Sequence, residues 1–388
     1  MRLKAVLLGV LSLMSCVAAQ SGALKAVLIE QADNPQLDRT RIERAYLGHP
    51  GGSAADGLNV ALDEAQFELD SEKASVKFST EAAANLDAAR AAAQKAEKAG
   101  AHALVVNLPQ AWVAPVAAAV KLPILNVSAR ADTLREKDCA ANLFHLVASE
   151  RMRADALAQT LMSRKWTAVL LLQGSSADDA ARGAVAQAAM KRYGLKTVAV
   201  KPFKLSTDPR ERALANLTLL TANQAYDVVW VVDSDGEFAR SLPYSTALPR
   251  PVVGDGGLVA LGWQAQFERF GAPQVSRRFA KAAKRPMTDP DWAAWMAGKA
   301  LVAVAMGAQR TDAASIHKTL LAANLDGSKG VALQFRPWDR QLRQPILLTD
   351  GQGVQGMMPQ EGVMHPRNVL DTLGADEPEK LCKAPSVP

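Results

Sequence analysis

The sequence predicts an α/β protein built on two doubly wound, mostly parallel sheets. Short β-branched apolar runs alternate along the chain with longer alanine-rich amphipathic stretches, which is the pattern of strands and helices in βαβ units. Most of the strand candidates contain a continuous apolar run, as in parallel sheets that are covered on both faces. With 388 residues, the chain is long enough for two such sheets, each with its own core.

The first half of the chain contains four strand candidates. Each is a short run rich in Val, Leu or Ile, and most are followed by an alanine-rich stretch that is long enough for a helix. A glycine-rich loop precedes the first helix. The predicted strands are 25–30, 74–80, 102–107 and 123–128, and the predicted helices are 53–69, 82–99 and 111–120.

The second half repeats the alternation after a break near 142–146. A late stretch, 331–350, is rich in strand formers and has no helix of its own. The tail after Asp371 is rich in Pro and Glu, and we expect it on a surface. The predicted strands are 167–173, 196–203, 227–233 and 250–255, and the predicted helices are 150–164, 177–193, 209–223, 236–242 and 291–308.

The N-terminus has the form of a secretory signal peptide. Arg2 and Lys4 form a basic start, an apolar run follows, and small residues precede a cut near Ala19. The apolar run is too short to span a membrane. We therefore predict that residues 1–19 are removed and that the mature protein is periplasmic. The alternative is a lipoprotein acylated at Cys16, but Met14 fits the required motif poorly.

Export also bears on the cysteines. Cys16 leaves with the signal peptide, so Cys139 and Cys382 remain. Two thiols in an oxidising compartment predict one disulfide. The alternative is a pair of unrelated buried thiols.

Charge and motifs exclude several classes of function. The formal net charge of +6 is mild, and the basic residues form no run interleaved with aromatics, so we expect no nucleic-acid partner. A small anionic ligand is compatible with this charge. The five His residues form no metalloprotease-type pair, and no CxxC, P-loop or G-x-S-x-G motif occurs. We therefore predict no enzyme and no metal site.

Ligands of doubly wound sheets bind at the carboxyl ends of the strands. The first half offers two such places, 107–112 and 128–130. The second half offers 173–176, 233–235 and 255–257. The glycine-rich loop that precedes the first helix adds free backbone N–H groups, which suit an anion.

Three stretches resemble the type I periplasmic solute-binding proteins of ABC transporters, the branched-chain amino acid family. Residues 123–149 resemble a family strand with its ligand loop and the Phe at the first crossover. Residues 228–245 resemble the strand end that carries ligand contacts in the second domain, and 289–305 resemble a late helix with a ligand-facing aromatic. The resemblance covers roughly 24–350.

The resemblance implies a monomer of two Rossmann-like lobes with parallel sheets, joined by three crossovers and closing on a ligand by a hinge. The crossovers are expected near 145, 252 and 333. The implied extents are 24–145 plus 252–332 for lobe 1, 146–251 plus 333–372 for lobe 2, and 373–388 for the C-terminal tail.

The departures from the family pattern concern the ligand. Amino-acid binders of the family place a hydroxyl side chain after the third strand, where this chain has Ala111, and a Thr after the fourth strand, where it has Arg130. They place an acidic residue after the last strand of the second lobe, where this chain has Gly256. An aromatic after the fifth strand is replaced by Ser175 and Ser176. A buried ammonium without a carboxylate partner is strongly disfavoured. We therefore exclude amino acids as the ligand.

The residues in these places predict a wide, flat site for an anion. Arg130 offers a planar fork of donors to a carboxylate, and Trp112 offers a face for stacking. The alternatives are a salt bridge of Arg130 to Asp132 or Glu136 and a core role for Trp292. The candidate site residues are Trp112, Arg130, Ser128, Trp292, His49, Gly51, Gly52, Ser53, Gln110, Ser175, Ser234, Asp235, Gly256 and Trp263.

One subgroup of the family accompanies alcohol oxidation systems that depend on pyrroloquinoline quinone (PQQ), and the stretches "WAAWMAGKAL" and "VVDSDGEFARSLPY" resemble it. PQQ is a planar quinone with several carboxyl groups. The resemblance implies a protein that binds PQQ as a ligand, not as a catalytic cofactor, and delivers it to an ABC permease or a PQQ-dependent dehydrogenase. Two alternatives stay open: a sensing or scaffold protein of the same fold, and a binder of aromatic monoacids such as benzoates.

Overall fold

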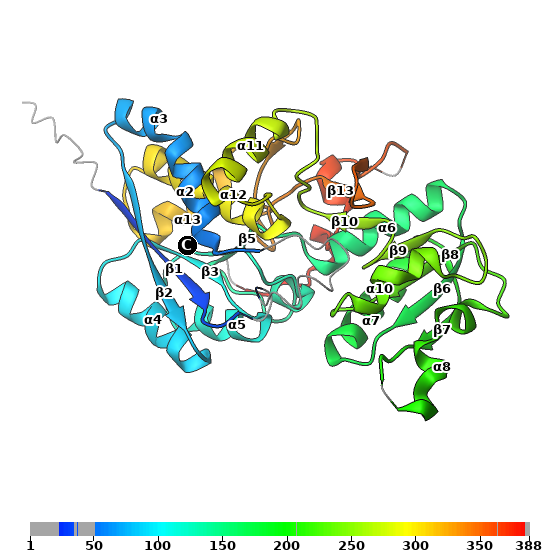
Figure 1. Cartoon of the computed structure of the whole chain (residues 1–388). Helices are drawn as coiled ribbons and strands as arrows, with labels where there is room; N and C mark the ends of the chain where they lie inside the picture. The colour runs from blue at the N-terminus through cyan, green and yellow to red at the C-terminus, as the bar shows by residue number, and fades with distance from the viewer. Residues whose placement is uncertain (1–22, 35–36, 38–50, 207, 363, 385–388) are drawn as a thin grey trace, which may run out of the picture.

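The structure, a computed structural model, describes residues 23–34, 37, 51–206, 208–362 and 364–384. The predicted signal peptide with Cys16 and the candidate site residue His49 lie outside the described residues. Within them the chain forms two α/β lobes that lie side by side, each built around its own sheet (Figure 1). The predicted α/β class with two parallel sheets is confirmed.

The first lobe contains a five-stranded parallel sheet in the order β2-β1-β3-β4-β5. Its central strands are almost fully buried, which explains why their sequences are apolar throughout. The short β5 falls in the stretch where the sequence predicts the break between the halves. The strands are β1 (Leu24–Gln31), β2 (Val76–Ala83), β3 (Ala103–Asn107), β4 (Ile124–Asn126) and β5 (Leu143–His145).

The second lobe contains a four-stranded parallel sheet in the order β7-β6-β8-β9. Because β9 is hydrogen-bonded to β8, it belongs to this sheet. The strands are β6 (Ala168–Gln173), β7 (Lys196–Pro202), β8 (Val228–Val232) and β9 (Val252–Gly254).

Helices pack on both lobes, and three late helices return to the first lobe, since their side chains Phe279, Trp292 and Ile316 join its core. The first lobe holds α2 (Ala54–Glu64), α3 (Gln66–Ser71), α4 (Leu86–Lys98), α5 (Gln110–Ala118), α11 (Ala272–Ala283), α12 (Asp289–Gly307) and α13 (Ala313–Ala322). The second holds α6 (Glu150–Ser163), α7 (Ala177–Arg192), α8 (Arg212–Ala215), α9 (Leu217–Thr221) and α10 (Glu237–Ser241).

The predicted helix 209–223 is broken into three pieces. Pro209 opens a 3-10 turn, and Asn216 has an extended backbone, with its side chain accepting a hydrogen bond from the N–H of Leu219. Asn side chains compete in this way with helical hydrogen bonds. The 3-10 turns are η2 (Asp132–Arg135), η3 (Pro209–Glu211), η4 (Leu242–Tyr244), η5 (Val369–Thr372) and η6 (Glu377–Glu379).

Two glycines let α12 approach α2 closely. A Cβ at Gly57 would lie 2.5 Å from the carbonyl oxygen of Asp291, and a Cβ at Gly298 would lie 2.5 Å from the Cβ of Ala61. Contacts this short are not tolerated in a packed core. The small residues therefore bring the late helix against the first lobe and fix the position of its N-terminus at Asp289.

A small antiparallel sheet lies between the lobes (Figure 1). Leu347 belongs to the core of the first lobe, whereas its neighbours Ile346 and Leu348 belong to the core of the second. The two faces of this sheet therefore seal different cores. Its strands, in order, are β10 (Val259–Leu261), β13 (Ile346–Thr349) and β14 (Val354–Met358); a separate pair is formed by β11 (Leu325–Asp326) and β12 (Ala332–Leu333).

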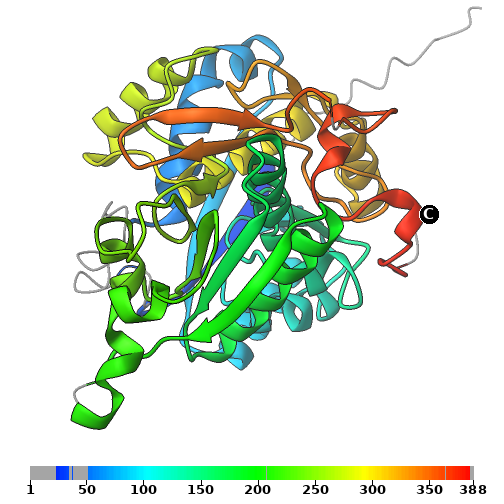
Figure 2. The same ribbon diagram turned by 90° about the vertical axis from the view of Figure 1, so that its right-hand side faces the viewer.

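The C-terminal segment lies beside β13 and β14 and touches both lobes (Figure 2). The predicted disulfide is confirmed: Cys139 and Cys382 are bonded, with Cα atoms 5.6 Å apart. The fully buried Arg336 donates to the carbonyl oxygens of Leu370, Leu373 and Ala375. Within the tail that the sequence places on a surface, residues 373–375 are therefore buried, whereas residues 376–384 are exposed or half-buried, as expected.

Candidate functional site

The loop after β4 is held in one conformation by buried side chains. The Asn126 amide accepts hydrogen bonds from the N–H groups of Ser128 and Ala129 and donates to the carbonyl oxygen of Ala129. The Ser128 hydroxyl donates to the carbonyl oxygen of Leu108 and accepts from its N–H. Ser128 therefore ties the ends of β3 and β4 together, and the next polar side chain of the loop is Arg130.

Arg130 makes a salt bridge, but not with the partners expected from its sequence neighbours. Its Nη2 lies 3.2 Å from a carboxylate oxygen of Asp289, at the start of α12. Asp132 instead accepts two hydrogen bonds from the N–H of Arg151. Burial raises the pKa of Asp132 to about 6, although Ser149 and Arg135 act in the opposite direction. Arg130 keeps about a third of its side chain exposed.

The helix start at Gly51, Gly52 and Ser53 is occupied by a carboxylate of the chain itself. The Ser53 hydroxyl donates to Glu30 over 2.5 Å, and the N–H of Ala54 donates to the same carboxylate over 2.8 Å. The anion that the sequence predicts at this helix start is therefore Glu30, at the end of β1, and a ligand anion would have to displace it.

The predicted aromatics are divided between surface and core. Trp112, on the first turn of α5, is half-buried against the first lobe, and Gln110 is exposed. Trp292 and Trp263 are at most 1% exposed and stack with ring centres 6.2 Å apart. Both are core residues in this structure, and Trp292 is covered by the residues after β11: its indole donates to the carbonyl oxygen of Gly327, and Lys329 lies over its ring.

The strand ends of the second lobe are organised by helix caps. Ser176 caps α7 together with Asp179, and Asp179 also accepts from the N–H of Ser234. Asp233 accepts from the N–H groups of Asp235 and Ala239. Ser175 is exposed, and Gly256 packs so closely on α10 that a Cβ there would lie 2.5 Å from the carbonyl oxygen of Ala239. The described residues contain no group of three or more potential metal ligands.

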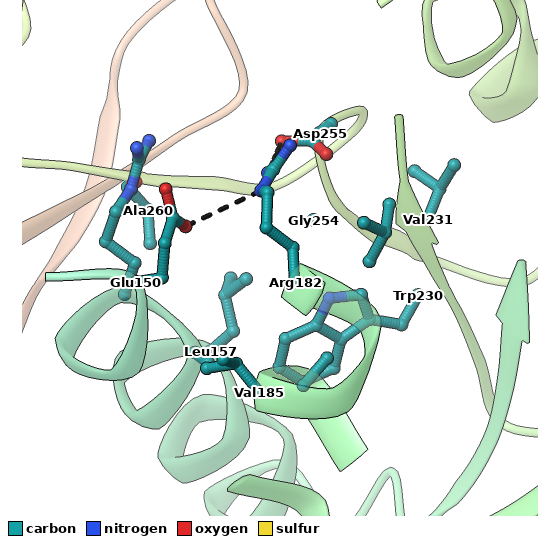
Figure 3. A pocket seen from close by; sticks show the side chains of 13 residues that line it. Glu150, Leu157, Arg182, Val185, Trp230, Val231, Gly254, Asp255 and Ala260 are labelled. Carbon is teal, nitrogen blue, oxygen red and sulfur yellow. Dashed lines mark hydrogen bonds and ion pairs between the residues drawn. The ribbon is translucent and has the colours of Figure 1, made fainter. Parts of the chain in front are cut away.

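A cavity opens beside these strand ends, between α6, α7, β8, β9 and β10 (Figure 3). Its volume is about 40 Å³, well below the roughly 300–1,000 Å³ of sites that enclose a whole small molecule, so it can take up one group of a ligand. None of the residues predicted for the site lines it. Its floor is apolar and its rim is charged, and the main lining residues are Ala154, Leu157, Val185, Ala186, Trp230, Glu150, Arg153, Arg182 and Asp255.

The rim is a network of ion pairs around Arg182. Its guanidinium lies 2.5 Å from Asp255 and 3.7 Å from Glu150, as the dashed lines in Figure 3 mark. Burial alone would lower the pKa of Arg182, but Asp255 and Glu150 raise it above its usual range. Burial alone would raise the pKa of Glu150, but Arg182, Arg153 and Arg130 lower it.

Arg153 is the least satisfied member of the rim. Its Nε donates to the carbonyl oxygen of Ala260 over 2.7 Å. Its Nη1 is buried and has no hydrogen-bond partner among the described residues. Burial lowers the pKa of Arg153 to about 10, and the neighbouring Arg130 guanidinium acts in the same direction.

Sequence reasoning missed Glu150, Arg153 and Arg182 because all three lie on helices, where Arg and Glu usually mark a solvated face. The one signal in the sequence is that α6 starts directly after the first crossover, so its first turn must face the other lobe. The acid expected after the last strand of the second lobe exists as Asp255, but its oxygens are taken by Arg182 and by the N–H of Asp233.

Comparison with solved structures identifies the class of fold. Similar chains include a periplasmic binding protein from Burkholderia mallei (TM-score 0.66, 14% identity, covering 93% of this chain and 98% of that one). Another is an ABC transporter solute-binding protein from R. palustris in complex with benzoate (TM-score 0.62, 16% identity, 88% and 98%). A third is a Leu-, Ile-, Val-, Thr- and Ala-binding protein from Brucella ovis (TM-score 0.66, 15% identity, 88% and 95%).

The fold is therefore that of the type I periplasmic solute-binding proteins, as the sequence resemblance implies. No protein-family model and no curated protein sequence matches the chain. At these sequence identities the similarity shows the fold alone, so the ligand must be inferred from the side chains of this protein. None of the helices in the described part of the chain has the length and apolarity needed to cross a bilayer.

Proposed function

We propose that this chain is a periplasmic solute-binding protein for a small planar carboxylate, with PQQ as the first candidate ligand. The observation that carries the proposal is the convergence of three arginines from separate elements. Arg130 comes from the loop after β4, Arg153 from α6 and Arg182 from α7. Arg153 and Arg182 line the same cavity, and the N–H of Glu150, at the start of α6, donates to the carbonyl oxygen of Arg130, so the three residues lie at one place.

Such a cluster favours a ligand with carboxylate groups. Neighbouring cations repel one another, and a carboxylate between them relieves that repulsion while accepting paired hydrogen bonds from a planar fork. The half-buried Trp112 and the Trp230 floor of the cavity supply apolar surface for an aromatic body. PQQ combines both features, and the resemblance to the subgroup of PQQ-dependent systems makes it the first ligand to test.

The two lobes divide the work of binding. Arg130 belongs to the first lobe and Arg153 to the second, so a ligand that contacts both favours the closed arrangement. Closure excludes water from the charged groups and strengthens their interaction with the ligand. The closed protein then presents the ligand to its acceptor, an ABC permease or an apo-dehydrogenase.

An aromatic monoacid is the second candidate. One unsatisfied guanidinium beside an apolar floor suits a ligand with a single carboxylate, which would enter the cavity while its ring lies at the mouth. The similarly folded R. palustris protein is in complex with benzoate.

A titration of the purified mature protein tests the proposal. Tryptophan emission or calorimetry is followed on addition of PQQ, benzoate, 4-hydroxybenzoate and Leu, after removal of any co-purified ligand by unfolding and refolding. We expect saturable binding of at least one of the three acids and none of Leu. Binding of Leu alone contradicts the exclusion of amino acids, and binding of no compound favours the sensing or scaffold alternative.

A further inference from the structure

We infer that the cavity between α6, α7 and the ends of β8 and β9 is a carboxylate subsite, and that Arg153 is the residue that recognises the carboxylate. The chemical class of ligand is an organic acid whose carboxylate enters the cavity while its body lies at the open mouth, because the volume of about 40 Å³ is too small for a whole aromatic acid. The inference rests on the proposed function for the identity of the ligand and adds the place where its carboxylate binds.

The first argument is the unmet hydrogen-bonding capacity of Arg153. The residue is 9% exposed, yet only its Nε has a described partner, the carbonyl oxygen of Ala260, and its Nη1 has none. A buried charged donor without an acceptor is costly, and folded proteins almost always pair such groups. An oxygen acceptor that enters the cavity would supply the missing partner.

The second argument is the distribution of charge around the rim. Arg182 is already held by Asp255 and Glu150, and Arg130 by Asp289. Arg153 has no ion pair of comparable distance among the described residues, although Glu150 and Asp289 act on it from farther away. It is therefore the guanidinium of the three that remains available to an incoming carboxylate.

The third argument is the floor of the cavity. Leu157 and Val185, from the two helices, face Trp230 from the middle of the second sheet (Figure 3). A site with an apolar floor and one buried cation selects a ligand whose apolar part lies next to its carboxylate. A neutral analogue of the same shape fills the floor but leaves the guanidinium unpaired, and this predicts discrimination between an acid and its amide.

The experiment compares acid and amide binding in matched variants. Benzoate and benzamide are titrated into the mature full-length protein, and PQQ is used as a second acid. The test variant is Arg153→Gln. The control is Arg164→Gln, which removes the same charge from the exposed end of the same helix. Circular dichroism and thermal unfolding check that each variant is folded.

We expect wild type and Arg164→Gln to prefer benzoate over benzamide by at least about 30-fold, as for a desolvated charge pair. We expect Arg153→Gln to lose this preference, and Arg153→Lys to recover part of it, while benzamide affinity changes little. The Lys variant separates recognition from a structural role, because both substitutions remove the Nε that donates to Ala260 and only Lys keeps the positive charge.

The outcomes separate this inference from the proposed function. If acids bind and Arg153→Gln binds them as wild type does, the subsite is wrong and the proposed function stands. If Arg153→Gln does not fold, the wild-type protein alone tests the subsite. Equal affinity of the wild type for benzoate and benzamide would then overturn it. If no acid binds, both proposals fall.

Discussion

The guanidinium of Arg130 lies 3.2 Å from the carboxylate of Asp289, a residue 159 positions later in the chain. This pair joins the loop after β4 to the start of α12. The Asp289 side chain is 6% exposed, whereas Arg130 remains partly open to solvent. A ligand carboxylate that approaches Arg130 must therefore share the guanidinium with Asp289.

We predict that Arg130→Ala weakens binding of the proposed acid by at least about 30-fold, since truncating one partner of a desolvated charge pair costs about 2–5 kcal/mol. Arg130→Lys should recover only part of the lost affinity, because an ammonium lacks the planar fork of donors.

Trp112→Ala should weaken binding of the acid by about 1–3 kcal/mol through lost stacking, and this loss should depend little on salt. Titrations at two ionic strengths check these values. Normal binding by both Ala variants would place the cleft elsewhere.

Hinge closure is the second prediction. The resemblance implies three crossovers between the lobes, and the small sheet of β10, β13 and β14 contacts both cores. Rigid-body rotation about these connections needs little change within either lobe. We expect small-angle scattering to show compaction when the proposed acid saturates the protein. An unchanged scattering profile at saturation contradicts closure, and Leu serves as the non-binding control.

The third prediction concerns the disulfide between Cys139 and Cys382. It closes a loop with a sequence separation of 243, and chain-entropy models give roughly 5–6 kcal/mol for so long a loop. We expect reduction to lower the thermal midpoint without unfolding the protein, because Arg336 and the Arg151–Glu379 pair still hold the tail. The Cys139→Ser/Cys382→Ser variant is the control and should be insensitive to reductant.

Intact-mass analysis before and after alkylation checks the bond itself. Protein exported to an oxidising compartment should contain no free thiol after loss of residues 1–19. Two alkylated thiols in unreduced protein would contradict the pairing.

Lys329 makes stability depend on pH. Its ammonium group lies 3.6 Å from the centre of the Trp292 ring and donates to Gln344 and to the carbonyl oxygen of Pro345. Burial lowers the pKa of Lys329 to about 7, although Asp289 raises it. The usual pKa of Lys is about 10.4. Between these two pKa values the unfolded chain binds a proton that the folded chain does not.

Stability should therefore rise with pH across this window, by at most about 1.4 kcal/mol per pH unit. The destabilisation by the buried charge is complete below pH 7 and disappears as the pH approaches 10. Urea unfolding of wild type and Lys329→Met between about pH 7 and pH 10 checks the sign, since the Met variant lacks this proton linkage. The free energy of unfolding of wild type should increase relative to that of the variant. Parallel curves would mean that Lys329 titrates normally in the folded protein.

The sequence by itself determined the elements that depend on local pattern. The eight predicted strands are all present, because short runs rich in strand-forming residues and bounded by turn residues alternate with helical stretches; the central ones are continuous apolar runs, as expected of buried parallel strands. The Cys139–Cys382 pairing followed from counting thiols after export. The fold class followed from the alternation of strands and helices, and the order of the motifs indicated the family.

Only the tertiary structure decided which groups satisfy one another. Glu30 fills the helix start at Ser53, Asp289 pairs with Arg130, and α12 turns Trp292 into the core. These partners are far apart in sequence, and periodicity carries no information about them. The cavity beside Arg153 arises in the same way, because α6, α7, β8, β9 and β10 meet there only after the chain has folded. A charged residue on a helix has the same local pattern whether it faces water or a ligand, and burial alone distinguishes the two.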